Sequence, residues 1–261
     1  DELISVTAEL LESLDGAMIT GCDLNTSLAD MERLTALTPH VLAAVGSPVD
    51  ASAATAHGTL GAVEAVLEKE LKDANPGRAL VHGCGAVGGT VARHLVDHGW
   101  TVFTVDLDRD KASLPGATPL PESCPWWELK LDMVLPCSIS GLINSEMAAA
   151  LRTPAVVPAA NAPFQQPQLA DDLRRRGVRV LPDPLVNAGA VIADSIERFS
   201  PDAWKDAGAK DVYAFVREEV RRRASDYLNQ REQGLSVGAA LHEVAATPTT
   251  EPIGLSFGES E

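Results

Sequence analysis

The chain has 261 residues, 45% of them hydrophobic, and a formal net charge of −16 at pH 7. That is enough for a substantial core, in one large domain or in a domain with a smaller partial one. The negative charge disfavours duplex nucleic acid as a partner, because phosphates would be repelled. No run approaches the roughly 18 apolar residues of a membrane-spanning helix, so we expect a soluble protein that does not insert into membranes.

The cysteines give little support for a metal site or a disulfide framework. Cys22, Cys84, Cys124 and Cys137 are scattered and form no Cys-x-x-Cys pair. A reducing compartment is the simpler assumption. The start of the chain shows no basic-then-apolar signal pattern. We therefore expect a cytoplasmic protein, or one inside an organelle if Asp1 is a processed terminus; a fragment is the other possibility.

The chain before residue 77 alternates helix patterns with one strand pattern. Apolar residues at 3–14 recur on one helical face, and residues 16–20 are typical of a short strand. After a polar turn at 23–26, Ser27 and Asp30 resemble a capping pair that opens a helix extending to Leu37. A further helix is predicted over 53–72, ended by an Asn-Pro-Gly turn at 75–77.

From residue 77 onward, strand and helix patterns alternate. Strands are expected at 79–82, 101–105, 133–135, 155–158 and 178–181, with a helix at 87–98. This alternation predicts an α/β fold, a doubly wound parallel sheet with helices on both faces. The connection at 106–117 is too short for a full crossover, so its helix must be abbreviated. A long helix is expected over 212–228, followed by a loosely ordered tail from 247.

A glycine-rich turn lies between the strand at 79–82 and the helix at 87–98. A helix that begins directly after a strand offers unpaired backbone N–H groups and the positive end of its dipole to a pyrophosphate. Gly83 permits the sharp turn, Gly85 lets the backbone approach the phosphates, and Gly88 lets helix and strand pack closely. This context predicts a dinucleotide-binding site formed by Gly83, Gly85, Ala86, Val87 and Gly88.

Asp106 closes the next strand and is the expected ribose-binding residue. Its carboxylate would accept hydrogen bonds from the adenosine ribose and repel a 2′-phosphate, which favours NAD over NADP. Arg109 and Lys111 nearby weaken that preference. A methyltransferase would also use a glycine turn and an acid, so this pattern alone does not select a nicotinamide.

Other motifs accompany the glycine turn in a characteristic order. They are Thr20-Gly21-Cys22-Asp23-Leu24-Asn25-Thr26, Ser52-Ala53-Ala54-Thr55-Ala56-His57-Gly58, Pro136-Cys137-Ser138, Ala159-Ala160-Asn161, Pro182-Asp183 and Asn187-Ala188-Gly189. Together they resemble the glutamate/leucine/phenylalanine/valine dehydrogenase family, most closely its phenylalanine and leucine members. The resemblance implies an NAD-dependent oxidoreductase that deaminates an L-amino acid to a 2-oxo acid and ammonia, in a homo-oligomer.

The resemblance also implies roles for individual residues. Asp23 matches the catalytic aspartate, which assists proton transfer at the substrate's amino group. Thr55, Asn161 and Asn187 match residues that contact the nicotinamide ribose and carboxamide. Cys137 and Ser138 match the cofactor loop after the fourth strand. The expected organisation is a substrate-domain remnant at 1–50, a dinucleotide-binding domain at 51–205, C-terminal helices packing back at 206–246 and a flexible tail at 247–261.

The chain departs from the family in its lysines. One family lysine holds the substrate carboxylate and another acts as base, and neither has a counterpart here. Activity would need them from another part of the protein or another chain. The alternative is a non-catalytic nucleotide-binding or assembly subunit. A homo-oligomeric copy or a partner chain is expected to cover the strand at 16–20, whose edge would otherwise be unpaired.

Simpler explanations exist for several of these residues. Asp23 would serve equally as a turn residue that hydrogen-bonds the backbone, and Asn187 as part of an ordinary helix entry. Cys137 fits a small buried side chain better than a nucleophile, because no histidine partner is evident. His57 and His82 are expected to be structural.

Overall fold

The computed structural model describes residues 2–22, 26–42, 45–71 and 76–247. These residues form two compact units. One unit comprises Ser52–Ala190 and Tyr213–Pro248, and the other contains Asp1–Ala51 and Val191–Val212. None of the helices in the described ranges is both long and apolar enough to cross a membrane.

A parallel sheet forms the centre of the first unit. Its strand order is β3-β2-β1-β4-β5-β6, the order of a doubly wound dinucleotide-binding sheet, which confirms the predicted fold class. The central strands are in register, with Leu80 opposite both Phe103 and Val134. The strands are β1 (Arg78–His82), β2 (Thr101–Val105), β3 (Thr118–Pro119), β4 (Met133–Pro136), β5 (Ala155–Val156) and β6 (Arg179–Val180).

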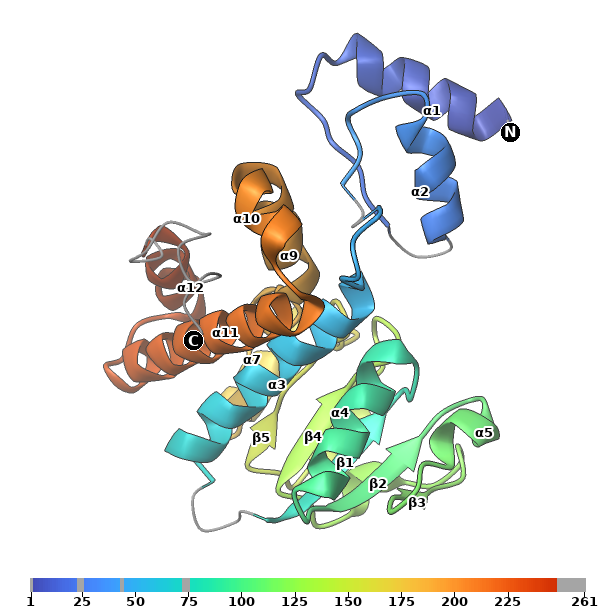
Figure 1. Ribbon diagram of the computed structural model, residues 1–261. Helices are drawn as coiled ribbons and strands as arrows, with labels where there is room; N and C mark the ends of the chain where they lie inside the picture. The colour runs from blue at the N-terminus through green and yellow to red at the C-terminus, as the bar shows by residue number, and fades with distance from the viewer. Residues whose placement is uncertain (1, 23–25, 43–44, 72–75, 248–261) are drawn as a thin grey trace, which may run out of the picture. The chain divides into compact units, whose positions relative to one another are not determined.

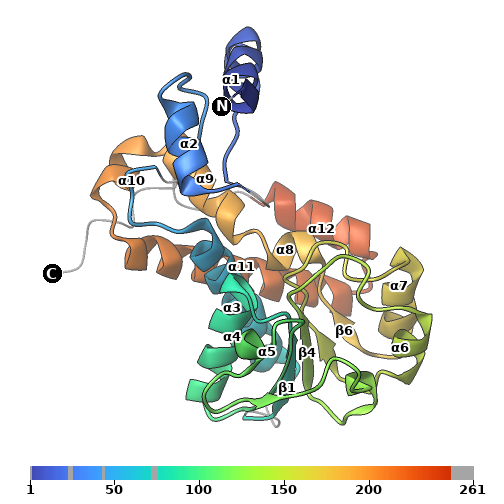
Figure 2. The ribbon, with the colours of Figure 1, turned by 90° about the vertical axis from the view of Figure 1, so that its right-hand side faces the viewer.

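Helices cover both faces of this sheet. Figure 2 shows α3 (Ala51–Lys69) and α4 (Ala86–Asp97) on one side, and α6 (Ser145–Ala150) and α7 (Pro167–Arg175) on the other. Helix α5 (Arg109–Ala112) is a single turn, which confirms the abbreviated connection. Trp126, in a short 3₁₀ turn (Trp126–Glu128), is buried in the core with Leu80 and Val134.

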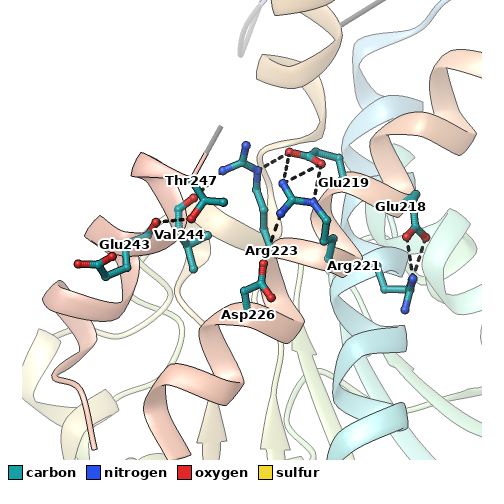
Figure 3. Close-up of polar contacts among 9 residues, drawn as sticks. Glu218, Glu219, Arg221, Arg223, Asp226, Glu243, Val244 and Thr247 are labelled. Carbon is teal, nitrogen blue, oxygen red and sulfur yellow. Dashed lines mark hydrogen bonds and ion pairs between the residues drawn. The ribbon is translucent and has the colours of Figure 1, made fainter. Parts of the chain in front are cut away.

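Two C-terminal helices complete the first unit. Helix α11 (Ala209–Glu232) lies across α3 (Figure 1), so close that a Cβ on Gly61 would lie 2.1 Å from the Arg217 carbonyl oxygen. Figure 3 shows how α12 (Val237–Ala246) is held: Arg223 donates to the Val244 carbonyl at 2.7 Å and to the buried Glu219 carboxylate at 2.6 Å. Along the chain, three helices follow β6 and precede α11: α8 (Asp183–Val186), α9 (Gly189–Phe199) and α10 (Pro201–Asp206).

The second unit begins with α1 (Glu2–Ser13) and α2 (Leu28–Thr35), which pack through Leu11 and Leu34. The predicted cap is confirmed, since Ser27 and Asp30 form a reciprocal capping box. The helix ends at Thr35 rather than at Leu37.

The predicted strand at 16–20 is wrong. Asp15 and Gly16 both have positive φ, 45° and 78°, so the chain leaves α1 through a tight turn instead of extending. Thr20 alone pairs, in an isolated parallel bridge with Val41. A long unpaired strand edge, the reason for expecting a covering chain, is therefore not formed by these residues.

Most other boundaries differ from the prediction by a few residues. Helix α3 is Ala51–Lys69 instead of 53–72, and β5 and β6 are two residues each instead of four. Strand β3, two residues in a proline-rich stretch, was not predicted. The predicted tail falls outside the described residues after Thr247.

Candidate functional site

The glycine turn between β1 and α4 is closed against the protein and open on one side. Gly83 has φ +93°, and a Cβ on it would lie 2.7 Å from Ser138. A Cβ on Gly88 would lie 1.9 Å from the Gly83 carbonyl oxygen and 2.8 Å from the Cys137 Cβ. A Cβ on Gly85 would meet nothing within 4 Å, so the backbone there is open to approach.

The start of helix α4 suits an anion. Gly85 is its N-cap and contributes no side-chain cap, so the N–H groups of the first turn, which includes Ala86 and Val87, lack a capping side chain. These amides and the helix dipole favour negative charge at this position. The glycine turn thus has an open backbone and uncapped first-turn amides at the start of α4.

Asp106 is fixed beside this turn. One carboxylate oxygen accepts from the Cys84 backbone N–H at 2.6 Å, and the other from the Asp108 backbone N–H at 2.9 Å. Asp106 therefore also braces the turn, a role the sequence did not predict. Two apolar side chains that sequence reasoning missed follow the same strand ends: Leu107 is 83% exposed and Ile139 64% exposed.

The loop after β4 brings Cys137 and Ser138 to the glycine turn. Ser138 Oγ lies 2.9 Å from His82 Nδ1. Burial raises the pKa of the Cys137 thiol to about 12 and that of Cys84 to about 11. Both thiols are therefore protonated near neutral pH, which argues against a nucleophilic role for Cys137.

Asn161 and Asn187 meet beyond the ends of β5 and β6. Asn187 Nδ2 donates to Asn161 Oδ1 at 2.7 Å and to the Ala159 carbonyl at 3.2 Å. Ser140 Oγ donates to the Asn161 carbonyl at 2.8 Å, which fixes this loop further. The two predicted cofactor amides thus form one hydrogen-bonded pair at the carboxyl edge of the sheet, where such sheets bind ligands.

Thr55 lies next to the segment that follows Asn187. A Cβ on Gly189 would lie 2.1 Å from the Ala54 carbonyl oxygen and 2.7 Å from the Thr55 Cα. Gly58 faces Gly189 in turn, with its added Cβ 3.2 Å from the Gly189 Cα. Helix α3 and the start of α9 therefore approach backbone to backbone, which only glycine permits.

Asp23 lies outside the described residues. A carboxylate that sequence reasoning missed lies near Gly21, which precedes Asp23 by two residues. Asp194 Oδ2 lies 4.0 Å from the position of a Gly21 Cβ. Burial raises the pKa of Asp194 to about 6. Nothing in the pattern of α9 distinguishes Asp194 from an ordinary polar helix residue. The described part of the chain contains no group of three residues that could hold a metal ion.

Comparison with known proteins identifies a family that this chain resembles. Residues 107–249 match the family described as Glutamate/Leucine/Phenylalanine/Valine dehydrogenase. The L-tryptophan dehydrogenase of Nostoc punctiforme is 30% identical over 199 residues, which cover 74% of this chain and 56% of that protein. The valine dehydrogenase of Streptomyces albus is 30% identical over 261 residues, covering 94% of this chain and 69% of that protein.

Solved structures give the same result for the fold. The crystal structure of L-tryptophan dehydrogenase from Nostoc punctiforme has a TM-score of 0.76 at 25% identity, covering 94% of this chain and 71% of that chain. The hetero-hexameric glutamate dehydrogenase from Thermus thermophilus has a TM-score of 0.73 at 21% identity, covering 94% and 67%, a likeness of fold alone. The chain spans little more than half the length of the curated tryptophan dehydrogenase.

Proposed function

Because the chain belongs to the glutamate/leucine/phenylalanine/valine dehydrogenase family, we propose that it contributes to NAD-dependent oxidative deamination of an L-amino acid to a 2-oxo acid and ammonia. The observation that carries this proposal is the glycine turn. It is sealed at Gly83 and Gly88 and open at Gly85, so it can hold a pyrophosphate against the start of α4.

The adenosine half of the cofactor would lie beside Asp106. Its carboxylate is held by two backbone N–H groups and would accept from the ribose hydroxyls, whereas a 2′-phosphate would meet a negative charge. NAD is therefore preferred to NADP. The exposed Leu107 and Ile139 side chains are suited to the apolar faces of an adenine ring.

The nicotinamide half would lie near the pair formed by Asn161 and Asn187, with Thr55 close to Gly189. Bound NAD would supply the acceptor for the hydride that leaves the substrate's α-carbon. The two side-chain amides orient the carboxamide and ribose, because their mutual hydrogen bond restricts both to one arrangement.

Asp23 is proposed to move the proton at the substrate's amino group. A carboxylate can accept a proton from an ammonium group and return it during formation and collapse of a carbinolamine. A base of suitable pKa and a cation for the substrate carboxylate are also needed, and the family's two lysines have no counterpart in this sequence. We propose that the rest of a longer protein, or another chain, supplies them.

The organisation proposed from the sequence is a substrate-domain remnant at 1–50, a dinucleotide-binding domain at 51–205, and C-terminal helices at 206–246. A homo-oligomer or a partner chain covering the remnant, in the cytoplasm or an organelle interior, belongs to the same proposal. Apolar side chains on the outer face of α1, including Leu3 at 78% and Leu10 at 55% exposure, favour such a covering partner.

The rival function is a nucleotide-binding subunit without turnover, favoured by the absent lysines. The test is to give the folded protein NAD and a panel of apolar L-amino acids and to follow reduced nicotinamide by absorbance. Turnover by a chain extended to the full length of its relatives, which disappears in Asp23→Asn with NAD affinity retained, is the expected result. Cofactor binding without turnover, by a chain extended to the full length of its relatives, would support the rival. No binding of either nicotinamide nucleotide by folded protein would refute both.

A further inference from the structure

One side chain beside the glycine turn has no role in the function proposed so far. His82 is the last residue of β1, directly before Gly83, and it is half-buried. Its Nδ1 lies 2.9 Å from the hydroxyl oxygen of Ser138, on the loop after β4. Sequence reasoning treated this histidine as structural and Ser138 as a cofactor residue.

The ring of His82 is held in a fixed orientation. It meets Trp126 edge to face, with ring centroids 5.7 Å apart and an interplanar angle of 61°. Trp126 is 1% exposed and stacks edge to face on Trp127 as well. Because the tryptophan is packed in the core, His82 has little freedom to rotate away from Ser138.

Ser138 is held from a second direction. A Cβ on Gly83 would lie 2.7 Å from the Ser138 N, Cα and Cβ, so the serine backbone packs directly on the glycine turn. The residue is nevertheless exposed, and the hydroxyl is bonded on one side only in the described structure. Its remaining hydrogen-bonding capacity is available to a ligand.

We infer that His82 is a positioning residue that fixes the Ser138 hydroxyl for the cofactor. This inference rests on the proposed NAD site. The neutral imidazole accepts the Ser138 proton at Nδ1, which leaves the lone pairs of Oγ free to accept from a sugar hydroxyl of NAD. A protonated imidazole can only donate, so it occupies one lone pair of Oγ and turns the Ser138 proton outward, which weakens Oγ as an acceptor for the sugar hydroxyl.

The electrostatic surroundings favour the neutral form. Burial lowers the pKa of His82 below its ordinary value, and the Asp106 carboxylate partly opposes this. Asp106, after β2, is the charged group that acts on His82 among the described residues; Trp126 and Ser138, from the other contacting segments, carry no charge. His82 is therefore neutral at pH 7.

The test measures NAD⁺ affinity by calorimetry on the whole chain and on four variants: His82→Leu, His82→Gln, Ser138→Ala and the double variant His82→Leu/Ser138→Ala. Loss of one neutral hydrogen bond should weaken binding about three- to tenfold in His82→Leu. His82→Gln, whose amide can still accept from Ser138, should stay within about twofold. In the Ser138→Ala background, His82→Leu should cost nothing further. Thermal unfolding verifies that each variant is folded.

The pH profile separates positioning from packing. At about 0.3 M salt, long-range attraction of the pyrophosphate is screened. Under these conditions wild-type affinity should fall as the pH is lowered below 7 and the imidazole becomes protonated, whereas His82→Gln should show no such fall. Additive losses in the double variant, or parallel profiles for wild type and His82→Gln, would overturn the inference and leave the proposed function standing. A folded wild-type chain that binds no NAD⁺ would overturn both.

Discussion

Two glycines of the same turn should respond in opposite ways to a single added methyl group. Gly88→Ala places a Cβ 1.9 Å from the Gly83 carbonyl oxygen and 2.8 Å from the Cys137 Cβ. Neither neighbour is the free end of a long side chain, so the helix α4 must move away from β1. Gly85→Ala places its Cβ in open space, at a φ of −69° that alanine adopts readily.

The expected magnitudes follow from these contacts. Overpacking of this kind lowers the free energy of unfolding by about 3 kcal/mol. The higher helix propensity of alanine offsets up to about 1 kcal/mol of that loss. Gly88→Ala should therefore lose about 2 kcal/mol of unfolding free energy, or about 4–8 °C in Tm for a chain of this size. Gly85→Ala should stay within about 0.5 kcal/mol of wild type, but its methyl group lies where the pyrophosphate would approach.

Thermal and urea unfolding followed by circular dichroism, together with calorimetric titration of NAD⁺, measure both effects. The expected pattern is a destabilised Gly88→Ala and a stable Gly85→Ala with affinity reduced at least tenfold. Equal stability of Gly88→Ala and wild type would refute the close approach of helix and strand. A Gly85→Ala variant that binds NAD⁺ normally would refute the location of the phosphates.

Three other changes test separate parts of the chain. Asp194 has a pKa of about 6, above its ordinary 3.8, so its charge destabilises the fold above pH 6 and this penalty vanishes as pH falls toward 4. Urea unfolding should show Asp194→Asn more stable by about 1–2 kcal/mol at pH 7, after allowance for partial exposure, and no gain at pH 4. Glu219→Leu removes the buried carboxylate that pairs with Arg222 and Arg223 and should cost about 1–3 kcal/mol in unfolding free energy. Glu218→Gln, at a side chain 61% exposed, should cost under about 1 kcal/mol, and equal costs for the two variants would contradict the account. Asp106→Asn keeps an acceptor for the turn but removes the charge, so the ratio of NADP to NAD affinity should rise at least tenfold by calorimetry; an unchanged ratio would exclude the ribose role.

The parts of the fold that the sequence predicted well are those fixed by local chemistry. Ser27 and Asp30 satisfy each other's backbone donors, and this capping box involves only residues three positions apart. The short connection after Asp106 limits its helix to one turn. The prediction of a strand at 16–20 was wrong because of local backbone geometry. Asp15 and Gly16 have positive φ, and an apolar run does not indicate that a tight turn precedes it.

The location of the candidate residues at one edge of the sheet was predictable, but their contacts were not. Strand ends and glycine spacing indicate that Asn161, Asn187 and Asp106 belong to one edge of the sheet. Only the coordinates show that Asn187 donates to Asn161, or that Asp106 braces the turn through Cys84. Partners separated by many residues in sequence depend on strand register and loop path, which residue patterns do not specify.

The proposed cofactor contacts and the proposed proton-transfer residue belong to different units. The glycine turn, Asp106 and the Asn161–Asn187 pair lie within Ser52–Ala190, whereas the segment containing Asp23 lies within Asp1–Ala51. Every hydrogen bond described for the cofactor site joins residues of the first of these units. The proposed NAD site therefore uses none of the residues proposed for the substrate chemistry. For this reason, binding by a chain that lacks the family's lysines is a fair test of the cofactor site, and absence of turnover in the same chain says nothing against it.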